Sequence, residues 1–150
     1  MTVKHYELDR LVMTELQPGA TTSEQLKKWQ GAASGIAEYV SSWGVERFWA
    51  MSRSPQLING VTPDPGTGTD EQRRYFAWGV ARVVLCRIVG GELRLTNAMT
   101  TAEFQARFRD LSFNQQMLFT DLLLEIADTI QFWTMRLKDT LEAGRGATEL

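Results

Sequence analysis

The sequence has very little of the two residue types on which many protein sites depend. Its 150 residues include one cysteine, Cys86, and one histidine, His5. A single cysteine excludes an intramolecular disulfide framework and any zinc or iron–sulfur site that needs several cysteines. A catalytic triad, a two-histidine zinc site or a di-iron bundle would have to depend on His5 alone. We therefore expect no metal, no cofactor and no enzymatic activity.

Long apolar runs are also missing. The longest uninterrupted apolar runs contain only three or four residues, far fewer than a membrane span needs. Residues 1–10 carry four charged side chains and lack the apolar segment of a signal peptide. Apolar neighbours around Cys86 predict a buried, unreactive thiol, which suits a reducing compartment. These features predict a cytoplasmic protein that does not enter a membrane.

The overall composition is that of one globular domain over residues 1–150. Hydrophobic residues make up 43% and charged residues 23% of the chain, and the formal net charge is −2. A chain of this length buries enough apolar surface to form a core without disulfides or metals. No internal repeat is evident in the sequence.

Helical periodicity covers most of the chain. Apolar residues recur at three- and four-residue steps, and Ser or Thr residues followed by Gln or Glu three positions later mark helix starts. The sequence predicts an all-α protein, an irregular or elongated bundle of four or five helices, of which 22–52 and 113–143 are long. The shorter predicted helices cover 6–17, 70–89 and 100–111.

Two glycines interrupt the first long predicted helix. Gly31 and Gly35 lie four residues apart, and each costs about 1 kcal/mol relative to alanine in a helix interior. Such a cost suggests that another backbone approaches this face closely. A kink over residues 41–44 is the competing explanation.

Residues 85–96 also fit a small β-hairpin. Two short apolar runs flank Gly90 and Gly91, the spacing of a two-residue hairpin turn. The helical interpretation is favoured because its periodicity begins at Phe76 and Gly90 is a suitable helix end.

Two segments show no regular pattern. Residues 53–69 contain three prolines and three glycines, which predicts a long loop. Loops of this length are often functional, although a tolerated surface insertion explains the composition equally well. Residues 144–150 have no apolar anchor, so we expect this tail to fray.

The last long predicted helix has a widened apolar stripe. Phe132 and two leucines at 118 and 122 lie beside the main stripe, which suggests that more than one face is covered. Asp121, Glu125 and Asp128 form a line along the same helix. Because no histidine follows three residues after a glutamate, this row is interpreted as a solvated acidic face rather than half of a metal site.

Charge is unevenly distributed along the chain. The segment 73–109 contains seven arginines and two acidic residues, a net charge of +5, whereas the rest of the chain carries −7. Arginines interleaved with aromatic residues are typical of nucleic-acid-binding surfaces. The alternative is that these arginines pair with acids of other helices, and the overall pI of about 5.5 favours it. The nucleic-acid candidates are Arg73, Arg74, Arg82, Arg94, Arg107 and Arg109.

Tryptophan is abundant, with five residues in the chain. Trp43, Phe48 and Trp49 are nearly consecutive along one predicted helix, so they cannot all face one buried stripe. Together with Leu57 and Ile58 of the predicted loop, they are the candidates for binding a protein partner. The sequence therefore predicts a non-enzymatic interaction or assembly subunit that binds itself or another protein, with nucleic-acid binding as the alternative.

Overall fold

A computed structural model describes residues 5–17, 22–52 and 70–149, with side chains for 6–17, 22–52 and 76–144. These ranges contain six helices and no strand, so the prediction of an all-α protein is confirmed. The helices are α1 (His5–Leu16), α2 (Ser23–Trp43), α3 (Val45–Met51), α5 (Asp70–Leu93), α6 (Thr101–Asp110) and α7 (Phe113–Glu149).

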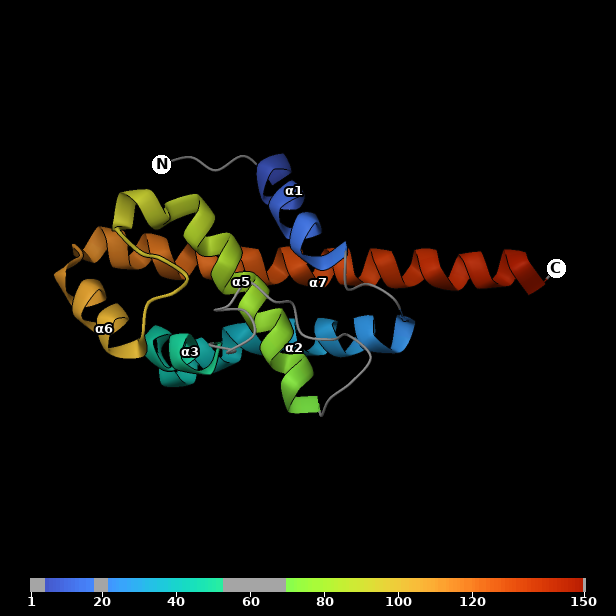
Figure 1. Cartoon of the computed structure of the whole chain (residues 1–150), viewed down its shortest axis with the longest axis horizontal. Helices are drawn as coiled ribbons and strands as arrows, with labels where there is room; N and C mark the ends of the chain where they lie inside the picture. The colour runs from blue at the N-terminus through green and yellow to red at the C-terminus, as the bar shows by residue number, and fades with distance from the viewer. Residues whose placement is uncertain (1–4, 18–21, 53–69, 150) are drawn as a thin grey trace.

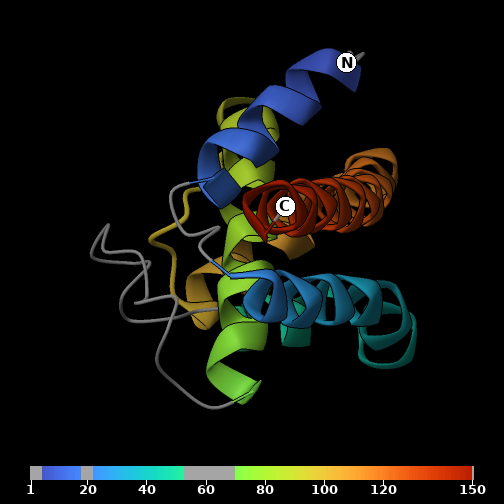
Figure 2. The same cartoon turned by 90° about the vertical axis from the view of Figure 1, so that its right-hand side faces the viewer.

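Helix α7 forms the long axis around which the other helices pack (Figure 1). Its 37 residues span about 55 Å at 1.5 Å per residue. Helix α2 lies alongside α7, and α5 crosses and contacts both of them. Figure 2 shows α1 and α2 on opposite sides of α7. The C-terminal end of α7 extends past the other helices.

Aromatic side chains fill much of the space between these helices. Trp29 of α2 stacks on Phe76 of α5 with ring centroids 4.2 Å apart. Trp49 of α3 stacks on Phe104 of α6 at 4.3 Å. Helix α1 docks through its buried apolar residues and through a hydrogen bond from Trp133 Nε1 of α7 to Asp9. The short first helix is therefore part of the core.

The predicted helix over 22–52 is divided in two at Gly44. This residue has φ of +87°, a conformation that glycine adopts without the steric penalty of a Cβ atom. Helix α2 ends there, and α3 begins at the next residue in a new direction. The prediction of one continuous helix was wrong, and the structure therefore describes six helices where four or five were predicted. The break falls within residues 41–44, where the competing interpretation of the sequence placed a kink.

The hairpin over 85–96 is absent, because α5 continues through both glycines to Leu93. Arg94 then adopts a φ of +56°, and the amide of Leu95 donates a hydrogen bond to the Gly90 carbonyl at 2.9 Å. This pattern is that of a Schellman helix end. A Cβ atom at Gly90 would lie 2.7 Å from the Leu95 carbonyl oxygen. Gly90 is therefore the residue over which the chain folds back.

Three of the predicted helix starts are present with the expected hydrogen bonds. Thr100 and Glu103 form a reciprocal capping box, and Ser112 with Gln115 forms another. The Thr22 hydroxyl accepts a hydrogen bond from the Gln25 amide.

The ends of the regular structure differ in part from the sequence prediction. The predicted loop over 53–69 lies outside the described residues. Helix α7 continues to Glu149, six residues beyond its predicted end near Ala143. Fraying of the tail stays a prediction.

Candidate functional site

The structure separates the residues predicted to bind a partner. The side chain of Trp43 is 55% exposed, whereas those of Phe48 and Trp49 are fully buried. The break at Gly44 redirects α3, so Phe48 packs near Trp78 and Trp49 stacks on Phe104. Phe48 and Trp49 are therefore core residues, which corrects their assignment to a surface. Leu57 and Ile58 lie outside the described residues.

Arg82, a predicted nucleic-acid contact, is a buried structural residue. Its side chain is 1% exposed and lies over the Trp49 ring, 3.8 Å from the centroid. Its guanidinium donates to the carbonyls of Trp49, Asn97 and Met99 at 3.2, 2.5 and 2.9 Å. These bonds tie the end of α3 and the α5–α6 connection to α5. Arg82 is therefore unavailable to an external phosphate in this structure.

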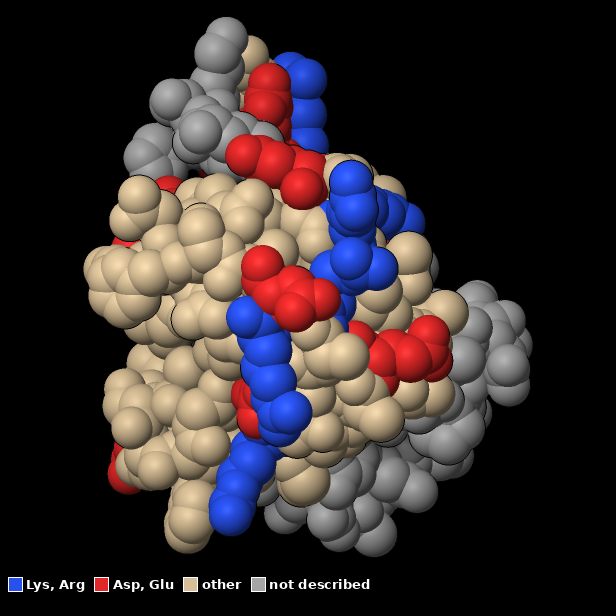
Figure 3. Space-filling view, turned by 90° about the vertical axis from the view of Figure 1, so that its left-hand side faces the viewer, with Lys and Arg blue, Asp and Glu red and all other residues tan. Residues whose placement is uncertain are grey.

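The other arginines of the basic segment do not form one continuous surface. Arg87 pairs with Glu15 of α1 at 2.6 Å, as the alternative interpretation of this segment predicts. Arg94 and Arg109 are exposed and Arg107 is half-buried, but acidic side chains interrupt the basic ones on the end of the molecule shown in Figure 3. The side chains of Arg73 and Arg74 lie outside the described part of the chain.

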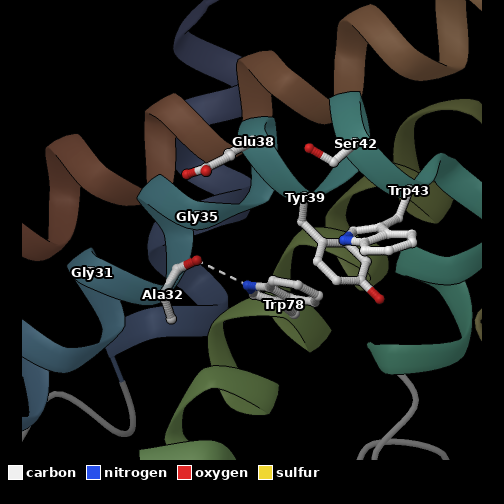
Figure 4. A pocket seen from close by; sticks show the side chains of 8 residues that line it. All are labelled: Gly31, Ala32, Gly35, Glu38, Tyr39, Ser42, Trp43 and Trp78. Atoms are coloured by element: carbon white, nitrogen blue, oxygen red, sulfur yellow. Dashed lines mark hydrogen bonds between the residues drawn. The ribbon is translucent and has the colours of Figure 1, made fainter.

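A shallow groove of about 240 Å³ follows the outer side of α2 (Figure 4). Gly31 and Gly35 line one stretch of it, and apart from the adjoining backbone of α2 no described atom lies within 4 Å of either Cβ position. The aromatic residues Tyr39, Trp43 and Trp78 line the rest, with Glu38 and Ser42 beside them. The indole nitrogen of Trp78 donates to the Ala32 carbonyl at 2.8 Å, which fixes this wall against α2.

The groove combines rings with a carboxylate. Glu38 is exposed and forms no ion pair with a described residue. The Arg47 guanidinium lies over the Trp43 ring at 4.4 Å from the centroid. A carboxylate and the face of an aromatic ring each attract cations, and both line this groove, so it suits an ammonium or guanidinium group.

A second unpartnered surface lies on α7. Six large apolar side chains are exposed among the residues whose side chains are described, and four of them belong to this helix: Phe113 (73%), Met117 (47%), Phe132 (55%) and Met135 (46%). At about 100° of rotation per residue they fall within a sector of roughly 100°, opposite the buried stripe of α7. Asp121 and Asp128 are exposed in the same sector and form no ion pair with a described residue. These six residues are called the α7 outer face.

One residue of this face is indicated by the sequence pattern. Phe132 widens the predicted apolar stripe of the helix, and the structure places it outside the core, while Leu122 is buried. Phe113, Met117 and Met135 were not singled out, because isolated apolar residues beside a cap or a charged residue do not show which face they occupy.

The single thiol and the side chains of metal-ligating types are further candidates for chemistry in the described residues. Burial raises the pKa of Cys86 from 9.0 to about 11, against the opposing effect of the Arg82 charge, so its thiol stays protonated at neutral pH. Over the ranges that the structure describes, no three histidine, cysteine or acidic side chains gather as metal ligands would. None of the described helices combines the length and apolar character that crossing a bilayer requires.

Comparison of the chain with models of known protein families, with curated proteins and with solved structures found no match.

Proposed function

We propose that the chain is a non-enzymatic helical subunit of a cytoplasmic complex and that it binds a protein partner through the α7 outer face. The observation that carries this proposal is the row of four exposed apolar side chains on α7. Burial of a phenylalanine or methionine side chain contributes about 1.5–3 kcal/mol. Four such side chains on one face therefore offer a partner several kcal/mol of favourable burial.

The charge of this face favours one kind of partner. Asp121 and Asp128 lie among the exposed apolar residues and have no ion pair with the described chain. An amphipathic helix with apolar residues at three- and four-residue spacing, flanked by lysine or arginine, complements such a surface. We therefore propose a basic amphipathic helix of another protein as the occupant.

The size of the chain in its native extract tests this proposal. A tagged chain, made in the cells that naturally contain it, is expected to elute well above the mass of the purified chain. Replacing Phe113, Met117, Phe132 and Met135 with glutamine removes the apolar surface and keeps a residue that favours helix. We expect this variant to elute at the mass of the purified chain.

A control variant introduces glutamine on another helix. Ala102→Gln and Ala106→Gln change exposed positions of α6, away from the α7 outer face, and should leave the larger species intact. The proposal is contradicted if the unaltered chain already elutes at its purified mass, or if the four-glutamine variant keeps the larger species.

Nucleic-acid binding is the competing proposal. The burial of Arg82 and the pairing of Arg87 with Glu15 weigh against it. Chromatography of the purified chain with absorbance at 260 and 280 nm, at low and moderate salt, separates the two proposals. Nucleic acid that co-elutes at low salt and is removed at moderate salt would favour the competing one.

A further inference from the structure

A second row of residues runs along α2 on the side opposite its buried stripe. The row alternates four- and three-residue steps, the spacing at which two helices meet along a shared seam. None of its members is buried. The row, called here the α2 outer face, consists of Glu24, Lys28, Gly31, Gly35, Glu38 and Ser42.

Two copies of this row are complementary to each other when their helices run antiparallel. If two copies of α2 cross midway between Gly31 and Gly35, each Gly31 faces the Gly35 of the other copy. Lys28 then faces Glu38, and this pair occurs twice. A parallel arrangement would instead place Glu38 against Glu38 and Lys28 against Lys28. We infer that the α2 outer face binds the same face of a second copy of this chain in antiparallel orientation.

The two glycines fit this arrangement. Each costs about 1 kcal/mol within a helix, and no described atom occupies the space that a Cβ at either position would need. Nothing within the described chain therefore compensates for the glycines. In the antiparallel pair they allow the two helix backbones to approach closely, because the distance between packed helices depends on the side chains at the contact.

The groove beside the glycines receives the basic end of the second helix. Residues 35–43 of one copy lie opposite residues 23–31 of the other, so Lys27 and Lys28 of the second copy reach the stretch that holds Glu38 and Trp43. A carboxylate and aromatic rings both stabilise an ammonium group there. The half-buried Lys28 lies 3.9 Å from the exposed Glu24 of its own helix, and its flexible side chain can also contact a second carboxylate.

The charges of the seam provide the first test. One helix pair buries less than the roughly 1,600 Å² of a standard interface, so we expect a dissociation constant of about 10–100 μM for the full chain. Sedimentation equilibrium measures it. Glu38→Lys should weaken the dimer at least about tenfold, because both copies lose a contact. Lys27→Glu combined with Lys28→Glu should weaken it similarly.

Mixing these variants distinguishes direct pairing from a loss of folding. The Glu38→Lys chain and the double-glutamate chain restore opposite charges across the seam, so an equimolar mixture should form a heterodimer near the original affinity. Asp128→Lys makes the same charge change on α7 and should have no effect. A chain that is monomeric up to millimolar concentration, or a dimer that Glu38→Lys leaves unchanged, overturns the inference.

The orientation is tested by cross-linking. Ser34 is exposed next to the crossing point, so Ser34→Cys should give a disulfide-linked dimer on oxidation. Ser42→Cys should not, because antiparallel copies hold these positions about 27 Å apart along the helix. Efficient cross-linking through Ser42→Cys overturns the antiparallel arrangement. This seam and the α7 outer face lie on different helices, so the four-glutamine variant should still dimerise, and either proposal can fail alone.

Discussion

Gly90 and Gly91 are neighbours in the last turn of α5, yet the structure predicts opposite effects when each is replaced by alanine. Apart from the adjoining helix backbone, no described atom lies within 4 Å of a Cβ at Gly91, whereas a Cβ at Gly90 would lie 2.7 Å from the Leu95 carbonyl oxygen. Leu95 cannot move away freely, because its amide donates the 2.9 Å hydrogen bond that closes the helix end. The contact at Gly90 is with backbone rather than with a flexible side chain.

The expected magnitudes follow from these contacts. Alanine at Gly91 gains helix propensity, about 0.5–1 kcal/mol near a helix end. Alanine at Gly90 gains the same propensity but displaces the Leu95 backbone and weakens the closing bond, at a cost of about 2–4 kcal/mol. We therefore expect Gly90→Ala to be less stable than the unaltered chain and Gly91→Ala to be slightly more stable.

Urea denaturation followed by circular dichroism measures both variants under identical conditions. A difference of 1 kcal/mol corresponds to about 2–4 °C in Tm for a chain of this size, so thermal melts give an independent reading. Equal stability of the two variants, or a Gly90→Ala chain more stable than the original, would refute this explanation of the α5 end.

Three further changes have expected outcomes. Arg82→Ala removes three hydrogen bonds from a buried guanidinium, together with its contact with the Trp49 ring, and should lower the free energy of unfolding by about 3–5 kcal/mol. Arg87→Ala removes only a partly exposed ion pair and should cost at most about 1 kcal/mol. Equal costs in urea denaturation would contradict the structural role of Arg82. Burial raises the pKa of Cys86 from 9.0 to about 11, so the thiol loses its proton more readily in the unfolded chain than in the folded one. The stability associated with the protonated thiol is therefore fully present below pH 9 and is lost as the pH rises toward 11. The free energy of unfolding should fall by about 2–3 kcal/mol over this range. Urea midpoints from about pH 8 to 11 should show this fall in the unaltered chain and its absence in Cys86→Ala. Arg94→Gly relieves a positive φ and should stabilise the chain by about 1 kcal/mol in thermal melts, a result that an unchanged or lower Tm would exclude.

The helices and their starts are readable from the sequence because they depend on local chemistry. The Thr100 and Ser112 caps need only a hydroxyl and a partner three residues later, and both form the expected hydrogen bonds. The docking of the first helix follows similarly from the spacing of its apolar residues. The spacing of apolar residues is readable because it repeats over several helical turns.

Features that depend on one backbone angle or on distant partners were predicted only in part. A kink over residues 41–44 was an alternative interpretation of the sequence, but the direction of the chain after it was not predictable. The positive φ of Gly44 decides where α3 points, and with it whether Phe48 and Trp49 are surface or core. The sequence does not indicate that Arg82 is buried, because its carbonyl partners come from three separate positions between Trp49 and Met99. The sequence suggested close approach of another backbone at Gly31 and Gly35, but only the structure shows that no described helix fills that space.

The most direct test of the proposed function measures whether the α7 outer face is covered where the chain works. Met117 and Met135 are 47% and 46% exposed, and half-buried Met99 serves as an internal reference. Dilute peroxide followed by mass spectrometry gives the oxidation rate of each methionine, in the native extract and in the purified chain. We predict that Met117 and Met135 are protected in the extract relative to Met99. Equal relative rates in the two samples would contradict the proposal that a partner binds this face.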